Sequence, residues 1–556
     1  IVGLAPGKYE LTVEKEGYKK SLSQNVDVAA EIVRGADVIL EIGEITATVT
    51  ISEDTLAQLQ TENANVAKSI TPAEVKRLPQ AGRDPYELAR LTPGILGDVS
   101  RSANGNSTGF PNSGSDTGPG ASSNSIFQAE NQPQISANGQ RVTANNFQID
   151  GVSVNSLTHG GAAVVTPNQE SVKEIQISST TYSAEDGRNS GAQIKVVSQN
   201  GTNDFHGSAF FKYNSPKLNA FNKYPNDFGR GFTERVERLF RQYGGSIGGP
   251  LYLPHFGEGG PVVYSGKNRA FFFFSYEALR DNSTIPSTQY VETPQFRQAV
   301  LASRAGSVTA GILGDGGVVP RIASVIPSTC DDLISGADRR CNAVPGGLDV
   351  GSLSLGTGQY VPNFFGGGLD GIPDIQKVII AAPRSNRPKQ YNARFDFTPG
   401  SNDQFTVSTY LTRSFFLGSD TGAAGRPQAD ITSAPHNSAF TVLYNKTFSP
   451  TLLNEVRFNF TKFAFNEVES SQETNFGIPR VEIENMFKDG SRIKFGANQA
   501  ETTPGIFSEK TFEIRDVVNY VRGNHGLKFG GEYRKELNDD NLNGASRPLY
   551  TFGGLF

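Results

Sequence analysis

Apolar and polar residues alternate in many short runs along the second half of the chain. A period of two predicts β-strands, because successive side chains of a strand point to opposite faces. Each run has one apolar, often aromatic, face and one polar or charged face. The clearest runs are residues 391–397, 405–412, 455–461 and 527–534. The pattern therefore predicts a mainly β fold with two-faced strands.

The connections between these strands alternate in length. Short ones at 398–403, 448–451 and 521–525 alternate with long ones at 279–390, 415–438 and 465–509. Outer-membrane barrels have this asymmetry, with short periplasmic turns and longer extracellular loops, whereas a soluble sandwich does not require it. Roughly ten candidate strands of about 9–11 residues follow residue 205, and the large plugged barrels have about 22, so we expect part of a barrel in a fragment of a longer precursor.

The first hundred residues predict smaller units. Residues 4–13 and 26–42 read as strands of a small antiparallel sheet. Thr71 before Pro72 predicts the start of a short helix, and Asp84 before Pro85 predicts another that ends at residues 93–94. Residues 97–131 are rich in Gly, Ser and Asn, which predicts a solvated segment.

Strand and turn signals follow closely between residues 134 and 213. An apolar/polar alternation ends in Asp150-Gly151, which predicts a tight turn between two strands. Residues 171–177 alternate cleanly, and 191–198 form a second strand-like run. Turn formers at 199–207 then separate these units from the long series of strands.

This order of pieces resembles the plug domain of TonB-dependent outer-membrane receptors, and the wording of residues 187–211 is most similar to the Oar-like branch. The resemblance implies a truncated carboxypeptidase-regulatory-like β-sandwich (1–43), a linker (44–70), an α+β plug domain (71–203) and the first half of a large antiparallel transmembrane β-barrel (204–556). The first of these modules carries no catalytic residues. The residues that match the plug wording are Arg83, Asp84, Asn138, Gly139, Asp150, Gly151, Glu174, Gly187 and Arg188.

The resemblance also implies a function. A receptor of this family lies in the outer membrane with its plug and N-terminal domain on the periplasmic side. It takes up a large or scarce ligand when a TonB-type protein pulls on an extended segment. The alternatives are a non-transporting surface protein, such as an adhesin or secretion-related barrel, and a soluble multi-sandwich binding protein. The expected partners are TonB, outer-membrane lipid and a ligand that is a glycan, a peptide or protein, or a siderophore, with a weak preference for glycan or protein cargo.

An extended segment rich in Thr and β-branched residues lies between the first two predicted domains. Such a segment can add itself as a strand to a partner's sheet. It has the position and composition of a TonB-contact segment, although its wording departs from the common one. The competing interpretation is the last strand of the N-terminal sandwich. The candidate residues are Glu44, Ile45, Thr46, Ala47, Thr48, Val49 and Thr50.

Composition limits the chemistry. The net charge of −5 comes from interspersed signs without a basic stripe, so nucleic acid is not expected as a partner. No nucleophile elbow, phosphate loop or zinc-protease motif occurs, so we expect neither an enzyme nor a metal or cofactor. Cys330 and Cys341 predict a disulfide within a loop, with two unpaired thiols as the alternative.

Four charged residues of the predicted plug have structural and functional interpretations. Arg83 and Asp84 are expected to be a surface charge and a helix cap, and the alternative is a direct role in signalling. Asp150 and Arg188 are expected either to pair within the plug or to contact the barrel wall, and the alternative is ligand binding.

Overall fold

The structure is a computed structural model, and it describes most of the chain. The described residues are 7–28, 38–43, 48–52, 66–78, 83–97, 135–157, 160–180, 182–186, 188–219, 238–254, 263–333, 341–350, 352–353, 360–361, 369–419, 421–469, 479–496, 505–523, 525–542 and 548–553. The solvated segment predicted at 97–131 falls almost wholly outside them.

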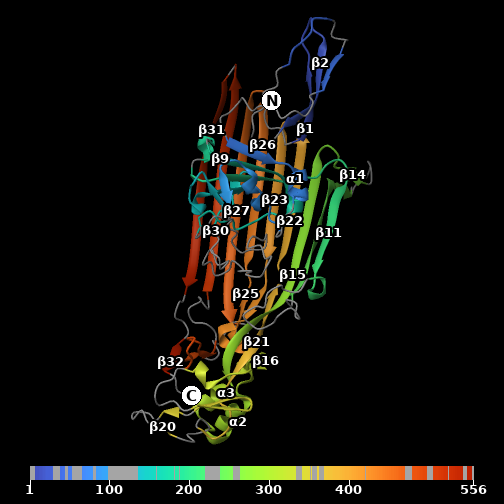
Figure 1. The fold of residues 1–556 in the computed structure, drawn as a ribbon. Coiled ribbons are helices and arrows are strands. Elements are labelled where there is room, and N and C mark those ends of the chain that lie inside the picture. The colour runs from blue at the N-terminus through green and yellow to red at the C-terminus, as the bar shows by residue number, and fades with distance from the viewer. Residues whose placement is uncertain are drawn as a thin grey trace.

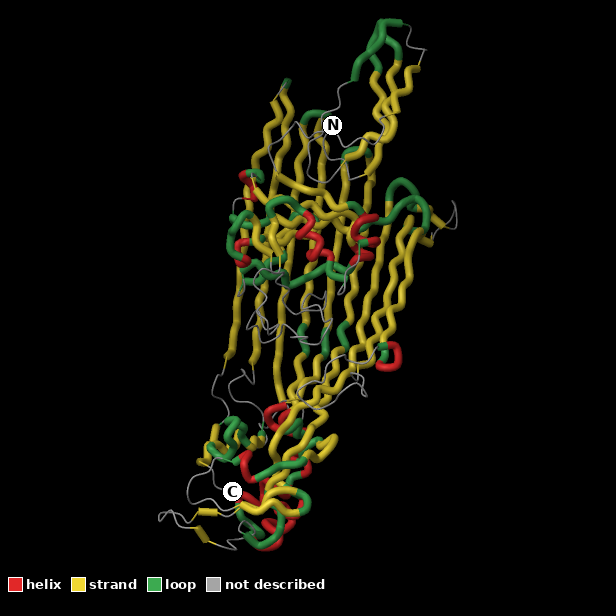
Figure 2. The backbone as a smooth tube through the Cα atoms, viewed as in Figure 1, coloured by secondary structure: helices red, strands yellow, loops and turns green. Residues whose placement is uncertain are grey.

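The parts of the molecule follow one another along a long axis (Figure 1). A small N-terminal sheet lies at one end, and a plug domain lies against one half of a tall wall of antiparallel strands (Figures 1 and 2). A module built from the long connections lies at the other end (Figure 2). The chain is mainly β, as the alternation predicted.

The N-terminal sheet has the order β1-β2-β3. Its strands are β1 (Gly7–Val13), β2 (Lys20–Val28) and β3 (Thr48–Ser52). β1 and β2 pair antiparallel, with a further bridge between Tyr18 and Ile42. β1 lies in the predicted region 4–13, but β2 begins at Lys20 and reaches the predicted region 26–42 only with its last residues, 26–28. The third strand, β3, pairs with β2 in parallel, from Lys20 opposite Thr48 to Gln24 opposite Ser52.

The plug is a mixed sheet with the order β4-β9-β10-β7-β8. Its strands are β4 (Val66–Ile70), β7 (Asn146–Ile149), β8 (Val152–Ser153), β9 (Val172–Thr180) and β10 (Gln193–Ser198), with the two-stranded sheet β5 (Ile95–Gly97) and β6 (Ile135–Ala137) beside it. Fully buried Ile70, Phe147, Ile175, Ile177 and Ile194 form the centre of its apolar core. The strands expected at 171–177 and 191–198 are therefore the middle of this sheet.

Local sequence signals produce the plug's turns and helices. Thr71 caps α1 (Pro72–Arg77) in a capping box with Glu74. Asp84 caps the next helix as predicted, but η1 (Pro85–Leu91) is a 3-10 helix and not an α-helix. Asp150 and Gly151 have φ of 50° and 77°, so they form the two-residue turn of the β7–β8 hairpin, which requires positive φ at both positions.

The wall is a run of sequential antiparallel neighbours, β11-β12-β15-β22-β23-β26-β27-β30-β31. Its strands are β11 (His206–Asn214), β12 (Arg238–Pro250), β15 (Ala270–Glu292), β22 (Lys389–Gly400), β23 (Asp403–Arg413), β26 (His436–Ser449), β27 (Leu452–Glu469), β30 (Gly505–Arg522) and β31 (His525–Leu542). The short turns predicted at 398–403, 448–451 and 521–525 join neighbouring strands at one end of the wall.

Several wall strands are longer than the 9–11 residues expected for a crossing. β15 has 23 residues because it continues past the wall: it pairs with β22 from Ala270 to Ala278 and with β21 (Ile375–Asn386) from Asp281 to Glu292. β27, β30 and β31 have 18 residues each. None of the described helices has the length and apolar character needed to cross a membrane.

The polar face of the wall is buried and its aromatic face is exposed. Polar side chains on the plug side, such as Asn392 and Asn459, are fully buried, whereas aromatic side chains on the opposite side, such as Phe405 and Phe458, are exposed. A soluble sandwich would bury the aromatic face. This arrangement matches a wall that turns its apolar side to lipid and its polar side to the interior.

The described parts of the long connections contain helices and strands, where the sequence had suggested irregular chain. We call the described parts of 281–386, 480–495 and 548–553 the loop module. It contains α2 (Pro294–Ser303), α3 (Val308–Gly314), β16 (Ile322–Ile326), β17 (Cys341–Val344), β18 (Gly347–Val350), β21, β28 (Arg480–Glu484), β29 (Ile493–Phe495) and β32 (Leu549–Gly553). It has its own apolar core, and fully buried Arg426 pairs with Glu292 at its base.

Candidate functional site

The candidate site is the surface along which the plug meets the wall. We call it the plug–wall seam. Its charged members are Arg83, Asp150, Glu170, Glu185 and Arg188 of the plug and Glu277, Arg394, Arg515, Lys528, Glu532 and Glu536 of the wall. Apolar contact contributes as well, because Tyr410, Ala439 and Phe463 of the wall belong to the plug's core cluster.

Arg83 is a buried cation of the seam. Its side chain bridges the two domains, since Nε donates to Oε1 of Glu277 at 3.1 Å and Nη2 donates to Oε1 of Glu170 at 3.3 Å. Its guanidinium carbon lies 3.7 Å from the ring centroid of Phe210 on the wall. Arg83 is 7% exposed and has a φ of 57°. The expectation of a surface charge is wrong, because two carboxylates compensate the buried cation.

The two carboxylates that hold Arg83 have further partners. Oε1 of Glu277 also accepts from Nε2 of Gln242 at 2.6 Å. Glu170 accepts a hydrogen bond from Ser208 on the wall and lies 3.5 Å from Nζ of Lys76. Burial raises the pKa of Glu170, but the Ser208 hydrogen bond and the charges of Lys76 and Arg83 outweigh it and lower that pKa below its ordinary value.

Asp84 stays within the plug. It is fully buried, and its Oδ1 accepts from the backbone N–H of Tyr86 at 2.9 Å. The predicted cap is confirmed, while a surface position is wrong. Burial, followed by the charge of Asp84, raises the pKa of Tyr86 well above its ordinary value. Asp84 thus fixes the backbone that carries Arg83 into the seam.

Asp150 contacts the wall, as one of the two predicted alternatives had it, but the predicted pair with Arg188 does not form. Within the plug it accepts from the backbone N–H of Ser198 at 2.9 Å and from the Ser198 hydroxyl at 2.6 Å. Towards the wall it lies 3.6 Å from Nη1 of Arg394 and accepts from Ser408. The neighbouring Gly151 touches the wall too, because a Cβ there would fall 1.3 Å from Nη1 of Arg457. The Asp-Gly turn is therefore a docking point of the plug.

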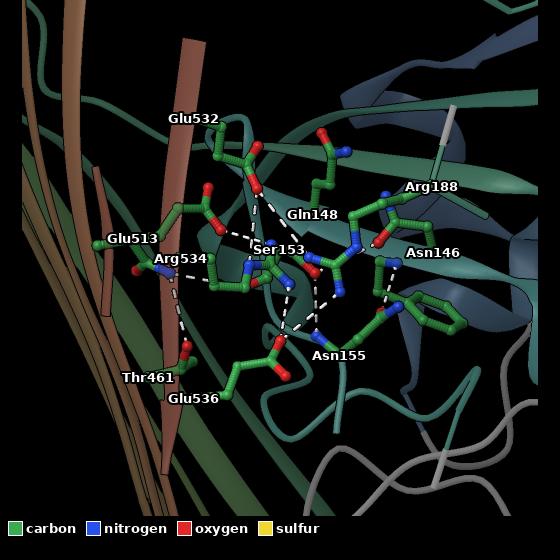
Figure 3. Close-up of polar contacts among 12 residues, drawn as sticks. Asn146, Gln148, Ser153, Asn155, Arg188, Thr461, Glu513, Glu532, Arg534 and Glu536 are labelled. Atoms are coloured by element: carbon green, nitrogen blue, oxygen red, sulfur yellow. Dashed lines mark hydrogen bonds and ion pairs between the residues drawn. The ribbon is translucent and has the colours of Figure 1, made fainter. Parts of the chain in front are cut away.

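Arg188 contacts the wall and does not pair with Asp150. It lies 3.6 Å from Glu536 and 4.0 Å from Glu532 on β31, and Figure 3 shows these groups around Arg534. Its side chain is 59% exposed, so this bridge contributes little stability. Close by, Glu185 accepts from Lys528 at 2.7 Å and pairs with Arg515.

An open polar cavity lies between plug and wall beside these ion pairs. Polar and charged side chains line it almost throughout, including Gln148 and Asn146 of the plug and Glu513 and Arg534 of the wall (Figure 3). A cavity with this lining is suited to water or a polar solute. It is not suited to an apolar one.

Backbone groups of plug residues 153–168 complete the seam. Wall amides donate to plug carbonyls, Gln390 to Thr166 and Asn437 to Val164, both at 2.7 Å. In the opposite direction, the backbone N–H of Leu157 donates to Glu509 at 3.0 Å. The plug is thus held mainly by separate polar contacts.

Two other residues of the plug sequence pattern, Asn138 and Glu174, make hydrogen bonds within the plug. Asn138 and Gly139 form a positive-φ turn, and the Asn138 side chain donates to the carbonyl of Ser179 at 3.0 Å. Glu174 accepts from Ser69 at 2.6 Å within the plug sheet. Gly187 lies outside the described residues. The residues that match the plug sequence pattern thus include internal plug residues as well as seam residues.

The structure describes only the second part of the candidate TonB-contact segment. Glu44, Ile45, Thr46 and Ala47 lie outside the described residues, whereas Thr48, Val49 and Thr50 begin β3. Because β3 pairs with β2, the structure places this part of the segment in the N-terminal sheet, as the competing interpretation expected. Binding a partner by strand addition would use the other edge of β3 or require its release.

Two further expectations concern the loop module and metals. Cys330 and Cys341 form a disulfide there. Among the described residues, no group of three or more His, Cys, Asp and Glu side chains is arranged to hold a metal ion.

The sequence did not single out the carboxylates that oppose Arg83. Glu277 lies 194 positions from Arg83, and only folding brings them together. One signal was present: Glu277 follows the aromatic run of residues 271–276, and a lone acid on such a strand needs a partner inside the wall.

Comparison with known proteins agrees with this architecture. Residues 197–556 match a family model described as an outer membrane beta barrel domain. The chain is 26% identical over 270 residues to the TonB-dependent transporter Oar of Myxococcus xanthus, covering 45% of this chain and 21% of Oar. It superposes on the outer membrane transporter YddB of Escherichia coli with a TM-score of 0.50 at 11% identity, covering 88% of this chain and 50% of YddB.

The chain spans about half the length of YddB and a smaller share of Oar. The family match covers more than half of the chain and coincides with the wall and the loop module. The expected outer-membrane location follows from it, and the aromatic outer face of the wall is the side that meets lipid. The chain belongs to the outer membrane β-barrel domain family.

Proposed function

We propose that this chain is part of a TonB-dependent outer-membrane transporter whose plug is displaced by force applied from the periplasm. The observation that carries the proposal is the plug–wall seam: a separate domain sits against the polar inner face of an outer-membrane wall. The similarity to Oar, which is itself named a TonB-dependent transporter, supports the same function.

The seam has properties suited to displacement. Many of its contacts are hydrogen bonds and ion pairs between groups that water can also satisfy, beside the apolar contact of Tyr410, Ala439 and Phe463 with the plug core. Each neutral hydrogen bond contributes a net of only about 0.5–1.5 kcal/mol. A continuous apolar interface would resist separation, because all of its surface would be exposed to water at once. A polar seam instead opens contact by contact, beginning where the cavity already separates plug and wall.

The proposed handle is the segment at residues 44–50. It precedes β4, the first strand of the plug sheet, so a pull on it is transmitted to β4 and then to its neighbour β9. A TonB-type protein would bind it by strand addition, a mode in which main-chain hydrogen bonds supply the affinity. The ligand is proposed to be a glycan, a peptide or protein, or a siderophore that meets the loop module first.

Cysteine cross-linking in cells tests the proposal. Single cysteines at positions 44–50 of the full-length protein are combined with a cysteine in the strand-adding region of TonB. We expect disulfide-linked heterodimers at alternate positions of the segment, and none from a control cysteine at exposed Glu10 on β1. Equal cross-linking at both places, or no cross-linking at 44–50, would contradict TonB engagement and favour a non-transporting surface protein.

A further inference from the structure

Two aspartates of the loop module face each other at the start of β21. β18 and β21 pair antiparallel with Leu348 opposite Ile375. Continuing this register by one position places Asp349 opposite Asp374, and the Asp374 N–H donates to the Leu348 carbonyl at 2.8 Å. Directly opposed residues of an antiparallel pair have Cβ atoms about 4.5–5.5 Å apart, and like charges there are destabilising.

Both carboxylates are buried and only half satisfied. Asp349 is 0% exposed and Asp374 is 1% exposed. Oδ2 of Asp349 accepts from the Gly371 N–H, and Oδ2 of Asp374 accepts from the Val350 N–H, each at 2.8 Å. Oδ1 of each aspartate is buried and has no hydrogen-bond partner. Two unpartnered carboxylate oxygens therefore lie in the same small region.

Within the described part of the chain, no positive side chain compensates this pair. The described residues that influence Asp374 electrostatically are the acids Asp349 and Asp370, and burial together with these charges raises the pKa of Asp374 to about 8. Asp370 is exposed and uses Oδ1 to accept from the Ile372 N–H. By contrast, the buried acid Glu292 in the same module is matched by Arg297 and Arg426.

We propose that Asp349 and Asp374 bind a divalent cation, Ca²⁺, in the loop module. Ca²⁺ takes six to eight oxygen ligands in flexible geometry and readily combines carboxylates with backbone carbonyls and water. Mg²⁺ requires a near-ideal octahedron and keeps more of its water. With only two buried carboxylates, the expected dissociation constant lies at about 10⁻⁴–10⁻³ M, the range of extracellular Ca²⁺ modules.

Such a site would link three strands within the loop module. Thr293, directly after β15, donates its N–H to the Asp374 carbonyl at 2.9 Å and its hydroxyl to the Pro373 carbonyl. A cation on Asp349 and Asp374 would thus join β18, β21 and the outer end of β15. This inference does not depend on TonB or on transport.

Equilibrium dialysis with radioactive calcium tests the site in the full-length protein in detergent. The wild type should show a binding component with a dissociation constant of about 10⁻⁴–10⁻³ M. We expect Asp349→Asn and Asp374→Asn each to lose this component when they are measured at about 1 mM Ca²⁺. The matched control is Asp331→Asn, which removes an exposed carboxylate of the same module and should retain that component.

A second readout covers variants that disturb folding. Ca²⁺, but not Mg²⁺ at the same concentration, should slow proteolysis within the loop module of the wild type and of Asp331→Asn, and should have no effect on Asp374→Asn. The proposal would be overturned if the wild type lacked this Ca²⁺-binding component, or if both aspartate variants retained it. It would also be overturned if lowering the pH protected the loop module from proteolysis while Ca²⁺ had no effect. The last result would indicate a proton shared between the two carboxylates.

Discussion

Replacing Arg83 by methionine should loosen the plug. The side chain keeps a similar length, but Glu277 and Glu170 lose the cation that bridges them. Glu277 is 0% exposed and Glu170 is 8% exposed, so water compensates neither carboxylate fully. Removing one partner of a buried ion pair costs about 3–5 kcal/mol. Since about 1.4 kcal/mol corresponds to a factor of ten, we expect plug opening to become roughly 100- to 4,000-fold more frequent.

Hydrogen exchange of the full-length protein in detergent measures this opening. Amides of β9 and β10 lie in the middle of the plug sheet, so they exchange by undocking or unfolding of the plug, whereas amides of β26 and β27 report on the wall. We expect faster exchange in the plug strands and unchanged exchange in the wall strands. Arg77→Met is the matched control, because Arg77 is an exposed cation in the last turn of α1.

A second substitution separates charge from packing. In Arg83→Met combined with Glu277→Gln, the uncompensated carboxylate is gone and Gln242 still has a hydrogen-bonding partner. This double variant should regain part of the lost protection. If Arg83→Met exchanges like Arg77→Met, the seam is not held by this bridge. If the double variant is worse than the single one, the explanation by a buried, unpaired charge is wrong.

Three further predictions concern other parts of the molecule. Asp84→Ala removes the η1 cap and should lower plug stability by about 1 kcal/mol, measured as faster β9 exchange; an unchanged rate would mean that the cap is dispensable. The pKa of Glu170 is lowered on folding, so its contribution to docking is present above its unfolded value of about 4.3 and is lost as pH falls through the folded value. Plug exchange should therefore accelerate in acid, and Glu170→Gln should remove that part of the pH dependence. Replacing Cys330 and Cys341 by serine together should destabilise the loop module by about 3 kcal/mol, seen as faster proteolysis there and unchanged exchange in the plug; equal proteolysis would refute it.

Short-range patterns predicted the elements well. The Thr71 and Asp84 caps, the Asp150-Gly151 turn and the wall strands depend on residues close in sequence, and the structure has all of them. The 3-10 geometry of η1 was missed because capping and proline signals are common to both helix types. The seam was missed for a different reason: whether Arg83 is exposed depends on Glu277, which a local pattern cannot place.

The ordered loop module was the largest omission. Its core combines residues from β15, from α2 and α3 and from the distant strands β28 and β29. Apart from β15, each contributing segment is short and carries little periodicity of its own. The sequence therefore predicted long irregular connections where the structure has a packed unit.

The strand β15 runs without interruption from the wall into the loop module. Glu277, which holds the plug through Arg83, and Glu292, which holds Arg426 at the base of the loop module, are on this same strand. At about 3.3 Å per residue they are roughly 50 Å apart along the backbone. No loop interrupts the strand between them, so one continuous β-strand connects the loop module directly to the residue that anchors the plug.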